Sequence, residues 1–438
     1  MQRDLYRKLL FWKNSPTRKP LLLQGARQVG KTWILKNFGE NEFESIAYFN
    51  FEEQIGIKQF FEMTKDPERI IEGLSLVNGK PIFAKKTLII LDEIQECNEA
   101  LNALKYFKEK APGYTIIGSG SLLGITLSRG RSFPVGQVDF LTLYPLTFSE
   151  FLSVAEPKLS AYIESLDKIE QIPDIFFNHL IEKLKVYFIS GGMPEAVVSM
   201  LGSGDIELVE SRLLNIINAY KLDFSKHIDK NDISRITYIW DSLASQLAKE
   251  NKKFLYRTVR QGARAREYEH ALQWLRQAGL IYQVFRLNKP SLPLTAYQDL
   301  SAFKIYLLDV GLLRRMANLF PTAIYEGNRL FTEFKGAMSG NFILQSLSPQ
   351  FEVLPYYWTS GNKAELDFIL QYQNEIIPIE VKSDTNIRSK SLTVYSNQYS
   401  PPLKIRYSLK NFEYNNGLLN IPLFLVDHTK RIIDLINS

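Results

Sequence analysis

A glycine-rich octapeptide near the start of this chain constrains its fold more than any other feature. It satisfies the pattern G-x-x-x-x-G-K-[ST] in full, with Gly25, Ala26, Arg27, Gln28, Val29, Gly30, Lys31 and Thr32. Glycines let backbone N–H groups surround phosphates, the lysine reaches the β- and γ-phosphates, and the threonine hydroxyl can bind Mg²⁺. The octapeptide follows an apolar run and opens a helical stretch, which is the context this chemistry requires. The sequence therefore predicts a loop that binds ATP together with Mg²⁺.

An acidic pair follows the apolar run at residues 88–91. Asp92 is expected to hold the hydration shell of the Mg²⁺, and Glu93 to polarise the attacking water. An acidic pair at the end of a strand can also do no more than keep that end in water. Because a complete phosphate-binding loop precedes this acidic pair in the sequence, the catalytic interpretation of the pair is favoured.

A turn of small residues, 118–121, follows the next apolar run. Ser119 in this turn is a candidate for contact with the γ-phosphate or the water, although glycine and serine favour turns in any case. Arg129 and Arg131 come after it, and an arginine there can stabilise transition-state charge in trans if the protein forms an oligomer. Surface arginines are common, so both interpretations stay open.

The spacing of the apolar runs predicts an α/β fold built on a parallel sheet. Near-continuous apolar runs separated by helical stretches are typical of strands buried on both faces. They occur up to about residue 151, at residues 21–23, 46–49, 87–91, 115–117 and 140–143.

Three further parts follow this core in the sequence pattern. A mostly helical stretch covers residues 152–232 and is interrupted at residues 191–194. Three short helices and two strands follow at residues 233–320, the order that a winged helix requires. Residues 321–438 open with a helix and continue with strands near residues 351–358, 365–370 and 376–382. Four domains are therefore predicted, with the core at residues 1–151.

Positive charge is concentrated in the middle of the chain. Residues 211–290 hold 15 Lys and Arg residues against 7 Asp and Glu residues, a surplus of 8, so the rest of this chain of net charge +6 sums to −2. A basic block suits an anionic partner, and nucleic acid is the usual candidate. A solvated helical face is the other interpretation.

The predicted winged helix carries four arginines ahead of its third helix, which is expected at residues 267–278. They are Arg257, Arg260, Arg264 and Arg266. In a winged helix the third helix can enter the major groove of DNA while flanking arginines contact phosphates. Winged helices also serve as protein–protein modules, so both kinds of partner stay open.

Composition excludes several classes of protein. No apolar run approaches the ~18 residues of a membrane helix, and charges stand where a signal peptide needs its apolar stretch. A single cysteine, Cys97, allows no intrachain disulfide, and with four histidines it leaves little for a structural zinc site. A cytoplasmic protein without a membrane segment is expected.

Two carboxylates and a lysine stand on predicted strands near the C-terminal end. Glu380 and Lys382 are two residues apart and so share a face of one strand, and Asp367 can lie beside them in a hairpin. Two carboxylates can hold a divalent metal such as Mg²⁺ or Mn²⁺, with a lysine orienting the water for phosphodiester hydrolysis. A hairpin with a charged solvent face explains the same loose pattern.

Taken in order, the motifs of the chain resemble a known family. The phosphate loop, the acidic pair and the turn around Ser119 fit it, as do residues 143–151, 191–196 and 304–311. Over nearly its whole length the chain resembles the prokaryotic AAA-type ATPases fused to a C-terminal PD-(D/E)xK nuclease-like domain. The resemblance implies an ATPase core, a helical lid, a winged helix and a terminal domain similar to restriction endonucleases.

The resemblance also implies roles for individual residues. It matches the ATPase residues to Lys31, Thr32, Asp92 and Glu93, a Gly-Arg element to Arg131, and the nuclease-like triad to Asp367, Glu380 and Lys382. Gly340 departs from the family pattern, because relatives usually carry Glu there. Glu333 lies two turns earlier, ~10 Å away along the helix axis, and cannot replace it. The departure implies weakened metal binding or a lost nuclease role.

Two functions of different class follow from these features. The first is an ATPase that acts on or with nucleic acid and uses its terminal domain to cut or grip it. The second is an ATP-driven switch whose winged helix and terminal domain bind a protein partner. The first predicts salt-dependent affinity for DNA, and the second predicts ATP-dependent assembly that is indifferent to DNA. A small-molecule kinase is disfavoured, because the downstream domains would then have no role.

Overall fold

The computed structural model describes residues 1, 3–121, 123–124, 136–227, 230–248, 253–326, 332–361, 364–383 and 390–437. The chain divides into two compact units. The first comprises Met1–Tyr144 with Gln277–Leu280, and the second comprises Pro145–Arg276 with Ile281–Ser438. Each unit contains a β-sheet of its own.

A parallel sheet forms the centre of the first unit. Its five strands have the order β2-β3-β4-β1-β5, and every pairing is parallel. The strands are β1 (Leu21–Gln24), β2 (Ser45–Asn50), β3 (Thr87–Asp92), β4 (Thr115–Ser119) and β5 (Asp139–Thr142). Each predicted apolar run overlaps one of them, so the predicted α/β fold with a parallel sheet is confirmed.

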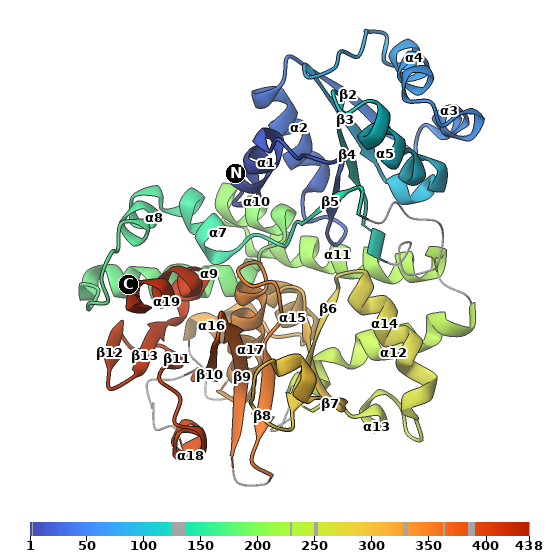
Figure 1. Cartoon of the computed structure of the whole chain (residues 1–438). Coiled ribbons are helices and arrows are strands. Elements are labelled where there is room, and N and C mark those ends of the chain that lie inside the picture. The colour runs from blue at the N-terminus through green and yellow to red at the C-terminus, as the bar shows by residue number, and fades with distance from the viewer. Residues whose placement is uncertain are drawn as a thin grey trace. The chain divides into compact units, whose positions relative to one another are not determined.

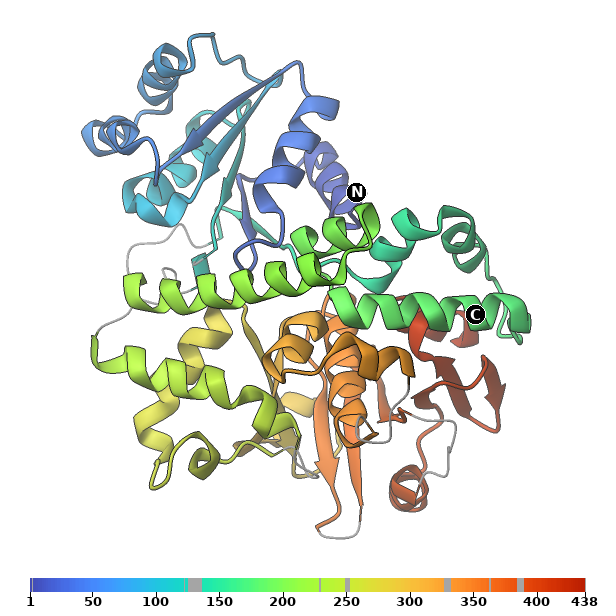
Figure 2. The ribbon, with the colours of Figure 1, turned by 180° about the vertical axis from the view of Figure 1, so that it is seen from behind.

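Helices cover both faces of this sheet (Figures 1 and 2). On one face lie α1 (Leu5–Asn14) and α2 (Lys31–Glu42), and on the other lie α3 (Lys58–Met63), α4 (Pro67–Asn78) and α5 (Asn98–Lys110). All six residues of β3 are buried. A strand between two helical layers has no solvent face, which explains why its sequence is apolar throughout. Two short 3-10 helices, η1 (Ile55–Ile57) and η2 (Ile94–Glu96), follow β2 and β3.

The second unit begins with helices only. They are α7 (Phe148–Ala155), α8 (Pro157–Glu164), α9 (Asp174–Ser190), α10 (Pro194–Gly202) and α11 (Ile206–His227). The helical stretch predicted at residues 152–232 is confirmed, and the predicted interruption separates α9 from α10.

A buried carboxylate joins this interruption to a later part of the second unit. Asp309 accepts hydrogen bonds from the backbone N–H groups of Gly192, at 2.6 Å, and Leu312, at 2.9 Å. Burial raises the pKa of Asp309 to about 6, and these hydrogen bonds oppose the rise. Residues 191–196 and 304–311, which the sequence singled out separately, therefore meet in one buried contact.

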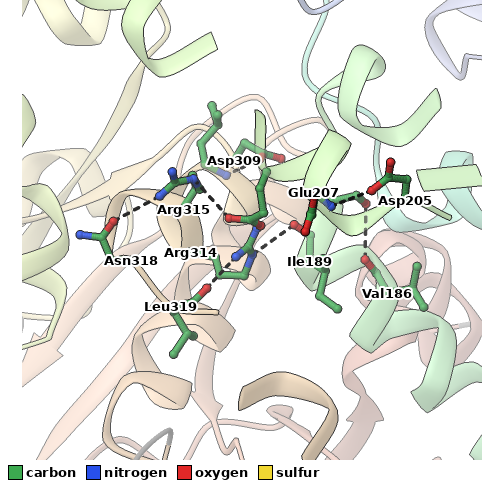
Figure 3. A network of polar contacts seen from close by, with 12 residues as sticks. Val186, Ile189, Asp205, Glu207, Asp309, Arg314, Arg315, Asn318 and Leu319 are labelled. Carbon is green, nitrogen blue, oxygen red and sulfur yellow. Dashed lines mark hydrogen bonds and ion pairs between the residues drawn. The ribbon is translucent and has the colours of Figure 1, made fainter. Parts of the chain in front are cut away.

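Arg314 continues this polar network one turn further along α15 (Val310–Met316). Its guanidinium is buried and donates to the carbonyl oxygens of Ile189, at 3.2 Å, and Leu319, at 2.6 Å (Figure 3). It also forms an ion pair with Glu210 of α11. The network holds α9, α11 and α15 together.

An eight-stranded mixed sheet completes the second unit, in the order β12-β13-β11-β10-β9-β8-β6-β7. Its strands are β6 (Ile281–Leu287), β7 (Gln298–Leu307), β8 (Tyr356–Thr359), β9 (Glu365–Tyr372), β10 (Glu375–Val381), β11 (Lys404–Ser408), β12 (Glu413–Asn415) and β13 (Leu418–Pro422). The strand predicted near residues 351–358 was placed too early. Pro355 has no N–H for a strand ladder, and β8 begins directly after it.

Helices and turns fill the remainder of the second unit. They are α12 (Lys230–Leu247), α13 (Tyr256–Val259), α14 (Ala265–Gln277), η3 (Leu294–Tyr297), α16 (Pro321–Glu326), α17 (Thr332–Leu347), α18 (Lys390–Tyr399), η5 (Leu423–His428) and α19 (Thr429–Asn437). No helix in the described part of the chain has the length and apolar character needed to cross a membrane.

The segment predicted as a winged helix shows the expected order of elements. Three helices, α12 to α14, are followed by the antiparallel pair of β6 and β7. β6 also pairs in parallel with β8, with Arg286 opposite Tyr357 and Leu287 opposite Trp358. One sheet thus continues across residue 320. The winged-helix assignment and the four-domain division stay predictions.

Candidate functional site

The predicted phosphate-binding loop joins β1 to α2 in a conformation that requires glycine. Gly30 precedes α2 with a left-handed φ of 96°, and Gly25 has a φ of 150°. A Cβ atom at Gly25 would lie 2.3 Å from the carbonyl oxygen of Leu143, so no other residue fits there. The loop thereby leads into the N-terminus of a 12-residue helix, where backbone N–H groups favour phosphate.

Lys31 is buried and points back into its own loop. Its Nζ donates hydrogen bonds to the carbonyl oxygens of Gly25, at 3.0 Å, and Ala26, at 2.9 Å. Burial lowers the pKa of Lys31 to about 8, while the carboxylates of Glu93 and Asp92 act in the opposite direction. An ammonium in this position can exchange the two carbonyl oxygens for phosphate oxygens.

Asp92 is the centre of the polar contacts at the end of β3. One carboxylate oxygen accepts from the hydroxyls of Thr32, at 2.7 Å, and Tyr48, at 2.8 Å. The other accepts from the Ser119 hydroxyl at 2.6 Å and from the backbone N–H of Glu93 at 3.1 Å. The structure therefore brings together the end of the phosphate loop and the ends of three neighbouring strands.

Ser119 is fully buried, and its hydroxyl is directed at Asp92. Its place is fixed by the pairing of β3 with β4, in which Asp92 lies opposite Ser119. The serine therefore orients the carboxylate. Its contact with a γ-phosphate or a water stays a prediction.

Glu93 follows Asp92 with a left-handed backbone, at φ 50° and ψ 43°. This conformation turns the chain out of β3 and into η2. The Glu93 carboxylate accepts a hydrogen bond of 2.5 Å from the side-chain amide of Gln95 in η2. The side chain expected to polarise water is thus held by a residue two positions later.

Sequence reasoning missed three residues of this site: Gln95, Tyr48 and Arg3. Tyr48 lies two residues before Asn50, which pairs with Asp92, so the strand register would have pointed to it. Arg3 is buried and donates hydrogen bonds to the carbonyl oxygens of Val29, at 3.0 Å, and Tyr144, at 2.6 Å. It thereby links the phosphate-binding loop to the segment after β5. No sequence pattern points to Arg3 or Gln95. The predicted residues Arg129 and Arg131 lie outside the described residues.

The four arginines predicted to contact nucleic acid all have exposed side chains: Arg257, Arg260, Arg264 and Arg266. The guanidinium of Arg260 lies 5.8 Å from the ring centroid of Tyr238. α14 buries the predicted apolar face, including Tyr268 and Leu275. The third helix begins at Ala265, two residues earlier than predicted, so Arg266 lies in its first turn and the other three arginines precede it.

The C-terminal carboxylates lie on the predicted hairpin, which β9 and β10 form. Lys382 Nζ lies 2.6 Å from Glu380 Oε1, so the two side chains share a face as predicted. Asp367 accepts a hydrogen bond of 2.9 Å from the backbone N–H of Val381. Burial raises the pKa of Glu380, Lys382 opposes this, and the charge of Asp367 adds to it. The three predicted residues are thus neighbours.

These carboxylates do not form a group of three. The described residues contain no cluster of three or more His, Cys, Asp or Glu side chains that could hold a metal ion. Gly340 lies buried within α17 and offers no third ligand. The side chain of Glu333 lies outside the described part of the structure.

The family model with a described domain type matches mainly the first unit of the chain. Residues 17–152 match a family model described as an AAA domain. By this match, the segment is an AAA domain. The AAA domain contains the whole phosphate loop, the acidic pair and Ser119. A domain of this type implies a bound nucleotide, usually with Mg²⁺.

The rest of the chain matches two family models without assigned roles. Residues 181–323 match a domain of unknown function, DUF8612, and residues 335–425 match another, DUF4143. A search of the curated proteins finds no match to the sequence. The winged helix and the nuclease-like domain therefore stay predictions beside the AAA domain.

Two solved structures are similar to this chain at low sequence identity. The Walker-type ATPase PABY2304 of Pyrococcus abyssi is 15% identical, with a TM-score of 0.43, over 72% of this chain and 95% of that chain. The RuvB Holliday junction branch migration motor of Thermotoga maritima is 15% identical, with a TM-score of 0.31, over 64% of this chain and 89% of that chain.

Proposed function

We propose that the AAA domain binds ATP with Mg²⁺ and hydrolyses it. The observation that carries this proposal is the hydrogen bond of 2.7 Å between Thr32 Oγ1 and Asp92 Oδ2. It joins two residues 60 positions apart, one ending the phosphate loop and the other ending β3. Two oxygen ligands side by side next to a helix N-terminus suit Mg²⁺, which prefers oxygen.

The surrounding residues supply the other parts of the reaction. Mg²⁺, when bound, neutralises charge on the β- and γ-phosphates. Lys31 exchanges its loop carbonyls for phosphate oxygens, and Tyr48 and Ser119 hold the Asp92 carboxylate in place. Glu93 accepts a proton from the attacking water as the water oxygen bonds to the γ-phosphorus and ADP leaves.

The second part of the proposal is that the protein acts on or with nucleic acid. It is supported by the exposed side chains of Arg257, Arg260, Arg264 and Arg266, and by the excess of positive charge in residues 211–290. Exposed arginines ahead of a helix and in its first turn suit phosphate contacts, which supply much of the affinity of nucleic-acid binding proteins.

We further propose that the terminal site grips nucleic acid rather than cutting it. Its Glu380 carboxylate is already paired with Lys382 at 2.6 Å, and Asp367 is engaged by the Val381 N–H. Gly340 adds no ligand. Two carboxylates, one of them neutralised by a lysine, attract a divalent metal less than an open group of three.

A different function, an ATP-driven switch that binds a protein partner, is equally compatible with the paired Glu380 and Lys382. In that case Arg257 and its neighbours face an acidic protein surface. The two functions differ in what the arginines contact and in the response to salt. Both retain the AAA domain as the part that consumes ATP.

The ATPase proposal is tested by turnover of purified variants. Lys31→Ala is expected to abolish nucleotide binding, because the buried ammonium is the group that meets the phosphates. Glu93→Gln is expected to bind ATP and reduce turnover by about 10²-fold or more, since it removes the proton acceptor. Full turnover by either variant contradicts the assignment.

The nucleic-acid proposal is tested with the same preparations. Single- and double-stranded DNA are incubated with Mg²⁺ or Mn²⁺, with and without ATP, beside Lys382→Ala and a variant with the four arginines changed to alanine. Binding that weakens with salt and is lost in the arginine variant, with the DNA intact, is expected. DNA cleavage that Lys382→Ala abolishes would show a working nuclease. Absence of DNA binding would favour the protein-partner switch.

A further inference from the structure

Gln95 contacts the proposed catalytic carboxylate from η2, the single turn that follows β3. Its side-chain Nε2 donates to Glu93 Oε2 at 2.5 Å. Its carbonyl Oε1 is buried and has no hydrogen-bond partner within the described parts of the chain. One end of the amide is thus bonded to the Glu93 carboxylate, and the other end finds no partner in the described structure.

Two glycines at the end of β4 make room for this arrangement. A Cβ atom at Gly120 would lie 1.9 Å from Gln95 Oε1. A Cβ atom at Gly118 would lie 2.8 Å from Ile94 Cδ1, in the same turn. The small residues beside Ser119 therefore allow η2 to approach the end of β4, and any side chain at Gly120 would push the amide aside.

Because the buried carbonyl has no partner among the described residues, this contact carries a cost in stability. A buried acceptor without a partner is unfavourable, and a leucine of similar size would avoid it. A buried polar group without a partner calls for an explanation, and a functional role is one such explanation. The feature that glutamine supplies and leucine lacks is the N–H group aimed at Glu93.

We propose that Gln95 is a positioning residue that fixes the Glu93 carboxylate for ATP hydrolysis. The inference rests on the proposed role of Glu93 as proton acceptor. Because the amide occupies Oε2, the other oxygen, Oε1, is left to take the proton of the attacking water. The water oxygen bonds to the γ-phosphorus, the bond to ADP breaks, and the proton ends on Glu93 Oε1.

The first test replaces the amide by a hydrocarbon of similar size in Gln95→Leu. Turnover is expected to fall about tenfold with an unchanged KM for ATP, since substrate contacts are kept and only the base is misplaced. The thermal midpoint is expected to stay the same or rise, because the unsatisfied carbonyl is removed.

Glu96→Gln in the same turn is the matched control, because the Glu96 side chain is exposed. Its turnover, its KM for ATP and its thermal midpoint are expected to equal those of the unmodified protein. A purely structural role for Gln95 would instead lower the thermal midpoint of Gln95→Leu and leave the turnover of the folded protein unchanged.

A second, independent test uses Gly120. The new Cβ atom of Gly120→Ala meets the Gln95 amide oxygen, so this variant is expected to reproduce the tenfold loss of turnover. In a Gln95→Ala background the same change is expected to add nothing, because the amide is gone.

Unchanged turnover in Gln95→Leu would overturn the inference. Glu93→Gln, measured alongside, separates this failure from a failure of the proposed function. If Glu93→Gln is inactive while Gln95→Leu is normal, only the role of Gln95 is wrong. If Glu93→Gln is fully active, the proton acceptor itself was misassigned.

Discussion

Lys31 holds two carbonyl oxygens of its own loop, and burial lowers its pKa to about 8. A nearby triphosphate favours the charged form of the lysine and so raises its pKa. Near pH 8 about half of the unliganded protein carries a neutral Lys31, and ATP binding therefore takes up about half a proton. The affinity for ATP is expected to be constant well below pH 8 and to fall as the pH rises through that value.

Titration calorimetry at pH 8 checks this residue-scale prediction. The observed binding enthalpy is expected to depend on the ionisation enthalpy of the buffer, with a slope near half a proton taken up. Lys31→Arg is the control, because an arginine stays charged and takes up no proton. A buffer-independent enthalpy for the unmodified protein would show that Lys31 is already fully charged.

At the residue scale, the site residues that could be predicted from the sequence are those that belong to a local motif. Lys31 and Thr32 belong to one octapeptide, and Asp92 ends a strand recognisable by its apolar run. Tyr48 and Gln95 touch the same acidic pair, but their places depend on strand register and on one left-handed residue. Neither determinant can be read from a single sequence.

At the element scale, two motifs pack backbone against backbone. A Cβ atom on Gly311 in α15 would lie 2.5 Å from the backbone nitrogen of Gly191, and one on Gly191 would lie 2.1 Å from Asp309 Oδ1. The elements can approach this closely only because glycines stand at the contact. The sequence showed each motif separately, whereas their contact is a property of the fold.

Gly311→Ala is therefore expected to destabilise the second unit by about 2–3 kcal/mol or more, since neither backbone can move aside without cost. Gly336→Ala in α17 is the matched control, because a Cβ atom there meets no described atom within 4 Å. That change is expected to stabilise by about 0.5–1 kcal/mol, as alanine restricts the unfolded chain. Urea unfolding of both variants measures whether the free energy of unfolding falls in Gly311→Ala and rises in Gly336→Ala. Equal free energies of unfolding in the two variants would contradict the close contact at Gly311.

At the scale of the whole molecule, the eight-stranded sheet combines strands from either side of residue 320. Leu287 of β6 pairs with Trp358 of β8 and belongs to the same apolar cluster. The Asn341 side chain of α17 bonds to both the N–H and the C=O of Leu307, at 2.8 and 3.0 Å. The β6–β7 pair is thus completed by residues that come later in the chain, a long-range pairing that periodicity cannot reveal.

A chain that ends at residue 320 is expected to lose the ordered β6–β7 pair. Hydrogen exchange of the amides in residues 281–307 is the measurement, with slow exchange expected in the full chain and fast exchange in the shortened one. Slow exchange in both would show that the predicted winged helix folds independently, and would support a domain boundary at residue 320.

The shared sheet also limits how genes of this kind can be recombined. A crossover that joins the first 320 residues to an unrelated partner would leave β6 without β8 and expose an apolar strand edge, which invites aggregation. A functional exchange of the C-terminal module has to carry β6 and β7 with it. The segment that can be exchanged between genes without breaking the sheet therefore has to begin at or before β6. It is longer than the C-terminal segment that holds Asp367, Glu380 and Lys382.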